Sequence, residues 1–245
     1  AILVFTLSGA RQAHTAFPGQ AVFLGWENSG EHNNTRRARD SIWGDPERSG
    51  FADPPGQCAG RCAIQGRAQV GAVVSEAGQY GGGNGATVHL PAGETAVEVG
   101  ATLGVVFHAP AARLTPAQVA GVIAGYVVVA DLSLPHSSYY RPAIREKCFD
   151  GACPVGARVV SPAEAGELAA VTLNTWVDGV LTQSRCLADL VRDVPTLVSE
   201  VSQFMTLNTG DMLLLGVVWQ AAQAAVGAQV RVEAGTLGAV EFALA

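Results

Sequence analysis

The residues best suited to chemistry gather in one stretch, residues 125–156, of a chain otherwise dominated by Ala, Val, Gly and Leu. Lys147, the only lysine of the chain, lies within it, and all the other basic residues apart from histidine are arginines. The polar residues of this stretch that could act in a site are Asp131, His136, Tyr139, Tyr140, Arg141, Lys147 and Asp150. Such a concentration of charge predicts a functional site here.

Two kinds of chemistry fit these side chains. An acid at the end of a strand, such as Asp131, can ligate Mg²⁺, because this hard cation prefers carboxylate oxygens. Tyr140, Arg141 and Lys147 can hold the carboxylates of a substrate by charge-assisted hydrogen bonds. The alternative is a solvated loop whose charges pair with one another, and the residue types alone do not decide between the two.

The composition narrows the class of protein. The chain has 245 residues, 49% hydrophobic and 15% charged, which is enough to bury a full core. A net charge of −6 makes nucleic acid an unexpected partner. No run reaches the roughly 20 apolar residues that span a bilayer, so no membrane association is expected. Five cysteines, an odd number, favour reduced thiols in a cytoplasmic protein, and Cys58 with Cys62 lacks a second pair for zinc.

Strands and helices that would position the cluster can be predicted on both sides of it. Residues 101–107 are expected to form a buried strand. A helix should start at Thr115, with Pro116 in the first turn and Gln118 completing a capping box, and run to Gly125. Residues 126–130 are expected to form the strand that places Asp131 at its end.

The second half of the chain shows mostly strand patterns. Residues 171–177 alternate as a strand, and Asp178-Gly179 indicates a hairpin. A second helix is predicted from Asp193, with Pro195 in its first turn and an inward face of Val194, Leu197, Val198 and Val201. Further strands are predicted over residues 212–218, 229–233 and 237–243. The pattern indicates a mainly β, mixed α+β fold with two short helices.

The chain divides into two regions by composition. Residues 1–86 comprise an apolar N-terminal strand and an atypical Arg- and Gly-rich segment, and residues 87–245 are expected to be the patterned domain. An insertion and a misread reading frame would both explain the character of residues 27–86. The sequence GGGNG at 81–85 lacks the Lys-Ser/Thr of a phosphate loop and is expected to be a turn.

Several motifs of the patterned domain resemble the fumarylacetoacetate hydrolase superfamily. The segments that carry the resemblance are LPAGETAVEVGATLGVV, AGYVVVADLSLP, SSYYRPAIREKCFDGACPVG and FMTLNTGD. The closest resemblance is to the N-terminal repeat, or subunit, of the bifunctional isomerase/decarboxylases of homoprotocatechuate (4-hydroxyphenylacetate) degradation. It extends over about residues 90–215.

The resemblance implies a fold, a cofactor and site residues. Members have a distorted β-roll, usually dimerise, and bind Mg²⁺ or Mn²⁺ through a Glu-x-Glu pair and an Asp. By position, Asp131 matches the metal-binding Asp, Lys147 the catalytic lysine, and Tyr140 and Arg141 the substrate-binding Tyr-Arg-Pro stretch. A homodimer, or a heteromer with a homologous subunit, and a small 2-oxo dicarboxylate or tricarboxylate substrate follow from the same resemblance.

The chain departs from the family at the metal ligands. The Glu-x-Glu pair aligns with Gly100 and Thr102, and a histidine of active members aligns with Gln12. Glu98 lies on the same strand face as Gly100, but two residues away, so it replaces a ligand only if the strand register shifts. The family's T-G-T-P sequence reads Leu-Gly-Val-Val at residues 215–218.

Three functions remain open from the sequence. The first is a 2-hydroxyhepta-2,4-diene-1,7-dioate isomerase / 5-oxopent-3-ene-1,2,5-tricarboxylate decarboxylase-type subunit, as the resemblance implies. The second is a catalytically degenerate scaffold that pairs with an active homologue, which the loss of the Glu pair favours. The third is an acylpyruvate-type hydrolase, which Gln12 disfavours because hydrolysis needs a base to activate water.

Overall fold

A computed structural model describes residues 4–6, 74–75, 81–136 and 144–245 of the chain. The strands of these described residues form three sheets. The largest has β11 (Ala222–Ala225), β5 (Ala96–Phe107), β10 (Asp211–Leu214), β1 (Val4–Thr6) and β2 (Val74–Ser75) in that order, with β6 (Ile123–Ser133) also paired to β5. The second has the order β4 (Ala86–Val88), β13 (Ala239–Leu244), β12 (Gln229–Glu233), β8 (Thr172–Val177) and β9 (Val180–Cys186). The third pairs β3 (Gly81–Gly82) with β7 (Cys153–Pro154).

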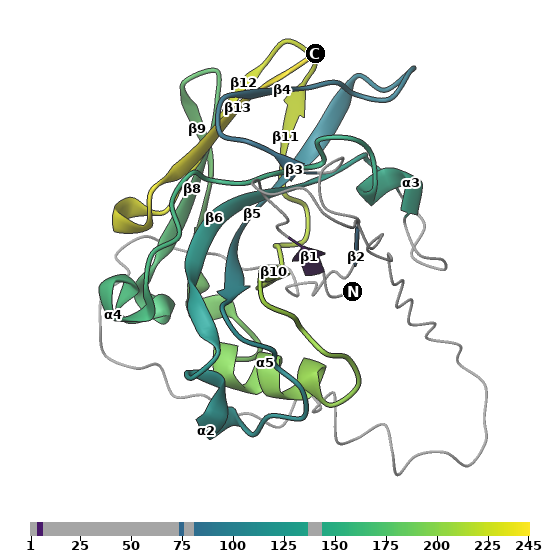
Figure 1. The fold of residues 1–245 in the computed structure, drawn as a ribbon. Coiled ribbons are helices and arrows are strands. Elements are labelled where there is room, and N and C mark those ends of the chain that lie inside the picture. The colour runs from purple at the N-terminus through teal and green to yellow at the C-terminus, as the bar shows by residue number, and fades with distance from the viewer. Residues whose placement is uncertain (1–3, 7–73, 76–80, 137–143) are drawn as a thin grey trace, which may run out of the picture.

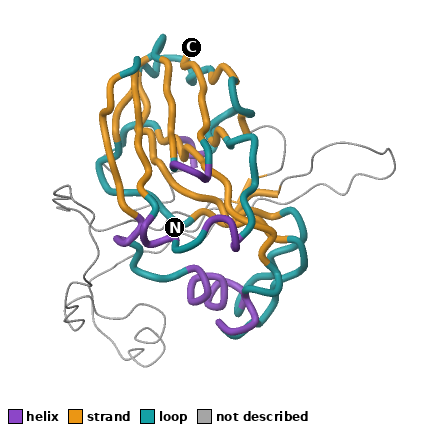
Figure 2. The backbone as a smooth tube through the Cα atoms, turned by 90° about the vertical axis from the view of Figure 1, so that its left-hand side faces the viewer, coloured by secondary structure: helices purple, strands orange, loops and turns teal. Residues whose placement is uncertain are grey.

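Short helices complete the described part of the chain. The α-helices are α2 (Pro116–Val119), α3 (Ile144–Lys147), α4 (Pro162–Ala165) and α5 (Val194–Ser202). The 3-10 helices are η1 (Leu168–Ala170), η2 (Leu187–Asp189) and η3 (Gly235–Leu237). Figure 1 shows α2 and α5 together beneath the ends of β5 and β6, and Figure 2 shows the strands forming most of the body above this helical end. The mainly β, mixed α+β prediction is confirmed, although the described residues hold two more α-helices than expected.

The long pair of β5 and β6 is the central feature of the fold. The two strands are antiparallel from Glu98 opposite Ser133 to Phe107 opposite Ile123, with an irregularity between Val106 and Phe107. Alternate residues of a strand point to opposite faces of the sheet. One face therefore supplies the main core through residues such as Leu103 and Val128, and the other faces a smaller apolar cluster.

The smaller cluster consists of Val106, Val127, Val129, Cys153, Met212 and Leu214. It lies on the face of β6 from which Asp131 also projects, since residues 127, 129 and 131 alternate along the strand. The predicted site is therefore built on the face opposite the main core.

Two local predictions are confirmed. Helix α5 begins after Asp193, whose side chain accepts a hydrogen bond from the Thr196 backbone N–H at 2.8 Å, and the four residues predicted to face inward are buried. The hairpin between β8 and β9 turns at Asp178 and Gly179, with φ of 51° and 77°. Positive φ at both central residues is the backbone of a type I′ turn.

The first predicted helix is much shorter than expected. Gln118 Oε1 accepts hydrogen bonds from the Thr115 backbone N–H and hydroxyl, both at 2.9 Å, as the capping motif predicts. The helix nevertheless ends at Val119 and not at Gly125, because the residues from Ile123 onward pair with β5. A β-branched run that can complete a buried sheet overrides a helical pattern of moderate strength.

No helix within the described residues combines the length and apolar character needed to cross a lipid bilayer.

Candidate functional site

Asp131 lies near the end of β6, directly opposite Gly100 of β5. It is 5% exposed, although a lone carboxylate is rarely buried to this extent. Directly opposite residues of an antiparallel pair project from the same face, so the carboxylate of Asp131 stands over the position of Gly100. The strand continues to Ser133, three residues beyond the end predicted at residue 130.

Lys147 supplies the charge partner of Asp131. Its Nζ lies 3.0 Å from Asp131 Oδ2, and the side chains are 19% and 6% exposed, respectively. The segment that carries Lys147 is fixed along β6 by backbone hydrogen bonds from Leu134 N to Glu146 O and from Leu132 N to Ala152 O, both 2.9 Å. The structure therefore brings together the predicted metal ligand and the predicted catalytic lysine as an ion pair.

Two cysteines lie beside this ion pair. Burial raises the pKa of the Cys148 thiol to about 11, with a further rise from the Asp131 carboxylate and an opposing effect from Lys147. Burial likewise raises the pKa of the Cys153 thiol well above its usual value. Both groups are therefore neutral thiols near pH 7, and the surroundings of the ion pair are largely apolar.

Among the residues that the structure describes, those around Asp131 do not fit a divalent metal. Gly100 offers no side chain, and Thr102 is fully buried with its hydroxyl directed at the backbone carbonyl of Leu103, 3.4 Å away. In the described part of the chain, no three His, Cys, Asp or Glu side chains are grouped so that they could hold a metal ion. Mg²⁺ needs near-octahedral oxygen ligation, which one carboxylate already paired with Lys147 does not provide.

The space beside Gly100 is occupied by another part of the chain. A Cβ at position 100 would lie 2.5 Å from Val217 Cγ1 and 2.8 Å from the backbone oxygen of Asp131. A glutamate therefore cannot occupy position 100 unless Val217 and the facing strand move. Glu98 does not compensate, because it pairs opposite Ser133 without a register shift, as predicted.

Arg185 is a buried charge that was not predicted from the sequence. It is 2% exposed, and its guanidinium binds Asp189 through Nε and Nη2 at 2.9–3.1 Å. Nη1 also donates to the backbone oxygens of Gly216 at 2.7 Å and Ala101 at 3.3 Å. Arg185 thus ties the residue before Val217 to β5. The available signal in the sequence was an Arg and an Asp four residues apart, a few residues after the predicted hairpin at Asp178-Gly179.

Several residues singled out in the sequence lie outside the described residues. They are Tyr139, Tyr140, Arg141, Gln12, Cys58 and Cys62. The substrate-binding role of Tyr140 and Arg141 therefore stays a prediction. The division of the chain at residue 87 also stays a prediction.

The fold and this site define a class of protein: a β-roll in which a buried carboxylate of one long strand faces its antiparallel partner. Residues 69–245 match the family model "Fumarylacetoacetate (FAA) hydrolase C-terminal", and the chain belongs to this family. The match begins before the predicted boundary at residue 87.

The chain is also similar in sequence to individual proteins of this family. The 4-hydroxyphenylacetate degradation bifunctional isomerase/decarboxylase of Escherichia coli is 37% identical over 150 residues, which are 61% of this chain and 34% of that protein. The chain therefore matches about one third of the length of this relative.

Solved structures share the fold. A 5-carboxymethyl-2-hydroxymuconate delta-isomerase from Mycobacterium smegmatis aligns with a TM-score of 0.60 and 25% identity, over 68% of this chain and 65% of that chain. A maleylpyruvate hydrolase from Sphingobium sp. SYK-6, in complex with manganese (II) ion and pyruvate, aligns with a TM-score of 0.61 and 23% identity, over 69% and 62% of the two chains.

The close contact at Gly100 gives a testable prediction for stability. Gly100→Ala is expected to lower the free energy of unfolding by about 2 kcal/mol, because the added methyl group overpacks against Val217 and the Asp131 backbone. In a Val217→Ala background, the same change should be less destabilising by about 1 kcal/mol, because Val217 Cγ1 is then absent. Urea unfolding of the four proteins measures both values.

Gly83→Ala is the matched control for this prediction. Nothing lies within 4 Å of a Cβ at position 83, so a change of only about 0.5 kcal/mol is expected. If Gly100→Ala were as mild as Gly83→Ala, the space beside Gly100 would be open, and a side chain could be accommodated at position 100.

Proposed function

We propose that this chain is a subunit of the 2-hydroxyhepta-2,4-diene-1,7-dioate isomerase / 5-oxopent-3-ene-1,2,5-tricarboxylate decarboxylase type. In this proposal it is catalytically degenerate and acts as a scaffold for an active homologue that carries the Glu-x-Glu pair. The assignment to aromatic catabolism rests on the similarity to the Escherichia coli isomerase/decarboxylase. The degenerate role rests on one observation: Val217 fills the space that a side chain at position 100 would need.

The ion pair between Lys147 and Asp131 supports the same proposal. In a metal-dependent member, the matching carboxylate would be shared with a cation of charge +2. Here the carboxylate is neutralised by the ammonium group of Lys147 at 3.0 Å. The Lys147 ammonium compensates the charge of the buried Asp131 carboxylate, so this carboxylate does not need a metal ion beside it. This arrangement is what we expect of a subunit that keeps the family fold but lacks two of the metal ligands.

A metal-binding experiment tests the degenerate role. The purified chain is expected to bind neither Mg²⁺ nor Mn²⁺ in calorimetric titrations, and its melting temperature should not change on adding either ion or EDTA. A specific ligand at about 100 times its Kd would stabilise the fold by about 2.7 kcal/mol, which a melting curve detects easily. Tight stoichiometric binding of either ion by the isolated chain would contradict the proposal.

A reconstitution experiment tests the partner. The chain should associate with a Glu-x-Glu homologue on co-expression, and the complex should turn over the substrates only when that homologue keeps its Glu pair. Turnover by this chain alone would show an active enzyme instead. Failure to associate with any such homologue from the same source would remove the scaffold role. A cytoplasmic location and a dimeric or heteromeric assembly are parts of the same proposal.

A further inference from the structure

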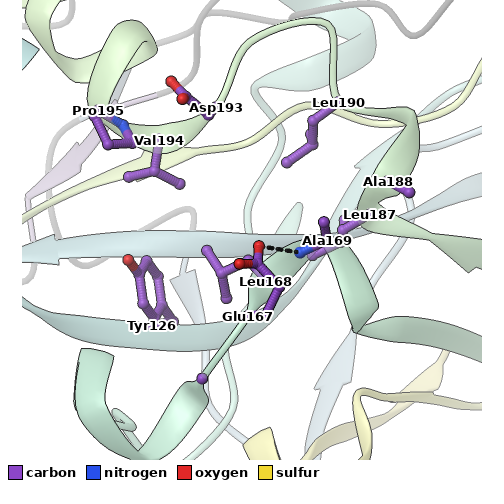
Figure 3. Close-up of a pocket in the computed structure, with 11 residues that line it drawn as sticks. Tyr126, Glu167, Leu168, Ala169, Leu187, Ala188, Leu190, Asp193, Val194 and Pro195 are labelled. Atoms are coloured by element: carbon purple, nitrogen blue, oxygen red, sulfur yellow. Dashed lines mark hydrogen bonds between the residues drawn. The ribbon is translucent and has the colours of Figure 1, made fainter. Parts of the chain in front are cut away.

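A cavity of about 340 Å³ lies between β6 and the start of α5 (Figure 3). The two carboxylates that line it are caps of the backbone. Glu167 Oε1 accepts a hydrogen bond from the Ala169 N–H at 3.3 Å, and Asp193 Oδ1 accepts one from the Thr196 N–H at 2.8 Å. Both carboxylates therefore serve the fold. A pair of residues with chemistry of its own lies elsewhere, in the turn between β3 and β4.

This turn contains the Asn-Gly pair of the GGGNG sequence. The Ala86 N–H donates to the Gly83 carbonyl oxygen at 3.1 Å and closes a turn with Asn84 and Gly85 at its centre. Gly85 has a φ of 81°, as the third residue of a type II turn requires. Asn84 and Gly85 are exposed, and within the described residues no atom lies within 4 Å of a Cβ at position 85. Water therefore reaches the pair.

An asparagine followed by glycine is prone to deamidation, because glycine has no Cβ to obstruct attack by its backbone nitrogen. The Gly85 nitrogen gives up its proton and forms a bond to Asn84 Cγ, and the side-chain amide leaves as ammonia. Water then opens the cyclic imide at one of its two carbonyls, which gives aspartate or isoaspartate. The net change exchanges ammonia for water and involves no oxidation or reduction.

Both reacting groups are bound to the backbone of Glu241 in the folded chain. Asn84 Oδ1 accepts a hydrogen bond from the Glu241 N–H at 2.8 Å, and the Gly85 N–H donates to the Glu241 oxygen at 2.6 Å. Glu241 belongs to β13, which pairs with β4 from Phe242 opposite Ala86 onward (Figure 1). The proton that the Gly85 nitrogen must lose is thus held in a hydrogen bond, and the carboxamide is fixed through its oxygen.

We propose that Asn84 is a deamidation site whose reaction is gated by the backbone of Glu241. The site reacts when the turn separates from β13, and it is protected while both hydrogen bonds are made. The reaction is irreversible and adds a negative charge at a side chain that is bonded to an acidic residue. Isoaspartate also lengthens the main chain by one carbon between Asn84 Cα and the Gly85 nitrogen, which disrupts the bond to Glu241. The site does not depend on the proposed function.

Deamidation of the full chain in mildly alkaline buffer, with and without urea, tests the site and its gate. Peptide-resolved mass spectrometry measures aspartate and isoaspartate at position 84. The folded protein is expected to react about thirtyfold more slowly than the unfolded chain, because two hydrogen bonds must break before the attack. Asn208 is the matched control, since it is also exposed but precedes Thr209. In urea it should react at least about tenfold more slowly than Asn84, because a β-branched side chain obstructs the attack.

Two variants separate the gate from the intrinsic chemistry. Ala86→Gly weakens the pairing of β4 but leaves the reacting pair intact, so it should speed the reaction about threefold in the folded protein and not in urea. Asn84→Gln keeps a carboxamide but would have to form a larger ring, so position 84 should stay unmodified. Far-ultraviolet circular dichroism checks that each variant is folded. Equal rates for Asn84 and Asn208 in urea would overturn the site. Equal rates for Asn84 with and without urea, or no effect of Ala86→Gly in the folded protein, would overturn the gate.

Discussion

Replacing Arg185 with methionine is expected to lower the free energy of unfolding by about 4 kcal/mol. The change removes the partner of Asp189, whose side chain is 5% exposed, and so leaves a buried carboxylate without compensation. It also removes the donor to the backbone oxygens of Gly216 and Ala101. Methionine fills much of the volume, so the loss reports the missing charge and hydrogen bonds rather than a cavity. Urea unfolding measures the difference.

Two further variants separate this effect from a general loss of charge. Arg231→Met breaks ion pairs of a side chain that is 46% exposed, so a change of about 0–1 kcal/mol is expected. Arg185→Met combined with Asp189→Leu should recover about 2 kcal/mol, because the uncompensated carboxylate is gone. If the Arg185→Met and Arg231→Met proteins were equally stable, the buried ion pair of Arg185 and Asp189 would contribute no more to the free energy of unfolding than an exposed ion pair.

Elements with local signals were predictable from the sequence. The N-cap at Asp193 and the Asp178-Gly179 turn depend on neighbouring residues only, and both lie where they were predicted. The strand predicted over residues 229–233 matches β12. Such features follow from short-range hydrogen bonding and backbone preference, which a single sequence carries.

Features that depend on distant pairing were less predictable. The helix predicted to run to Gly125 ends at Val119, because the pairing of β6 with β5 decides the conformation of residues from Ile123 onward. The strand predicted over residues 237–243 is present as β13 (Ala239–Leu244), which begins two residues later than predicted because Leu237 ends a 3-10 helix. Propensity is a weak prior that tertiary contacts override.

In the candidate site, too, local features were predictable and distant contacts were not. Residue types located the polar cluster, and the family motif identified Asp131 and Lys147. The ion pair between Asp131 and Lys147 depends on how residues 146–152 pack along β6. No local sequence pattern predicts this packing. The contact between Val217 and Gly100 joins residues far apart in the chain, so the absence of two ligands was readable from the sequence but the filling of their space was not.

Lys147→Met is expected to lower the free energy of unfolding by about 3 kcal/mol, the second large effect. Asp131 would keep a charge in a site where it is 5% exposed, with no cation beside it. The loss is smaller than for Arg185 because the Lys147 side chain is 19% exposed, so solvent already screens part of its interaction. Adding Asp131→Asn should restore about half of the stability, since the unpaired charge is then removed.

Arg145→Met is the matched control on the same helix. Arg145 binds Glu94 at 2.8 Å, but it is 65% exposed, so its loss should change the free energy of unfolding by less than about 1 kcal/mol. If Lys147→Met and Arg145→Met were equally mild, the pair with Asp131 would be an incidental surface contact, and its support for a fold without metal would be lost.

The Cys148 thiol reports the electrostatics of the same pair. Its pKa of about 11 leaves about one thiolate in a thousand near pH 8, so alkylation by iodoacetamide should be slow. Lys147→Met should raise this pKa further and slow the reaction, because the ammonium no longer stabilises the thiolate. Asp131→Asn should lower the pKa and speed the reaction, because the opposing carboxylate is gone. Peptide-resolved mass spectrometry follows Cys148 separately from the other cysteines. Faster alkylation of Lys147→Met than of Asp131→Asn would mean that the Cys148 thiol does not sense the two charges as described. The Lys147 ammonium would then not take the place of a metal cation beside Asp131.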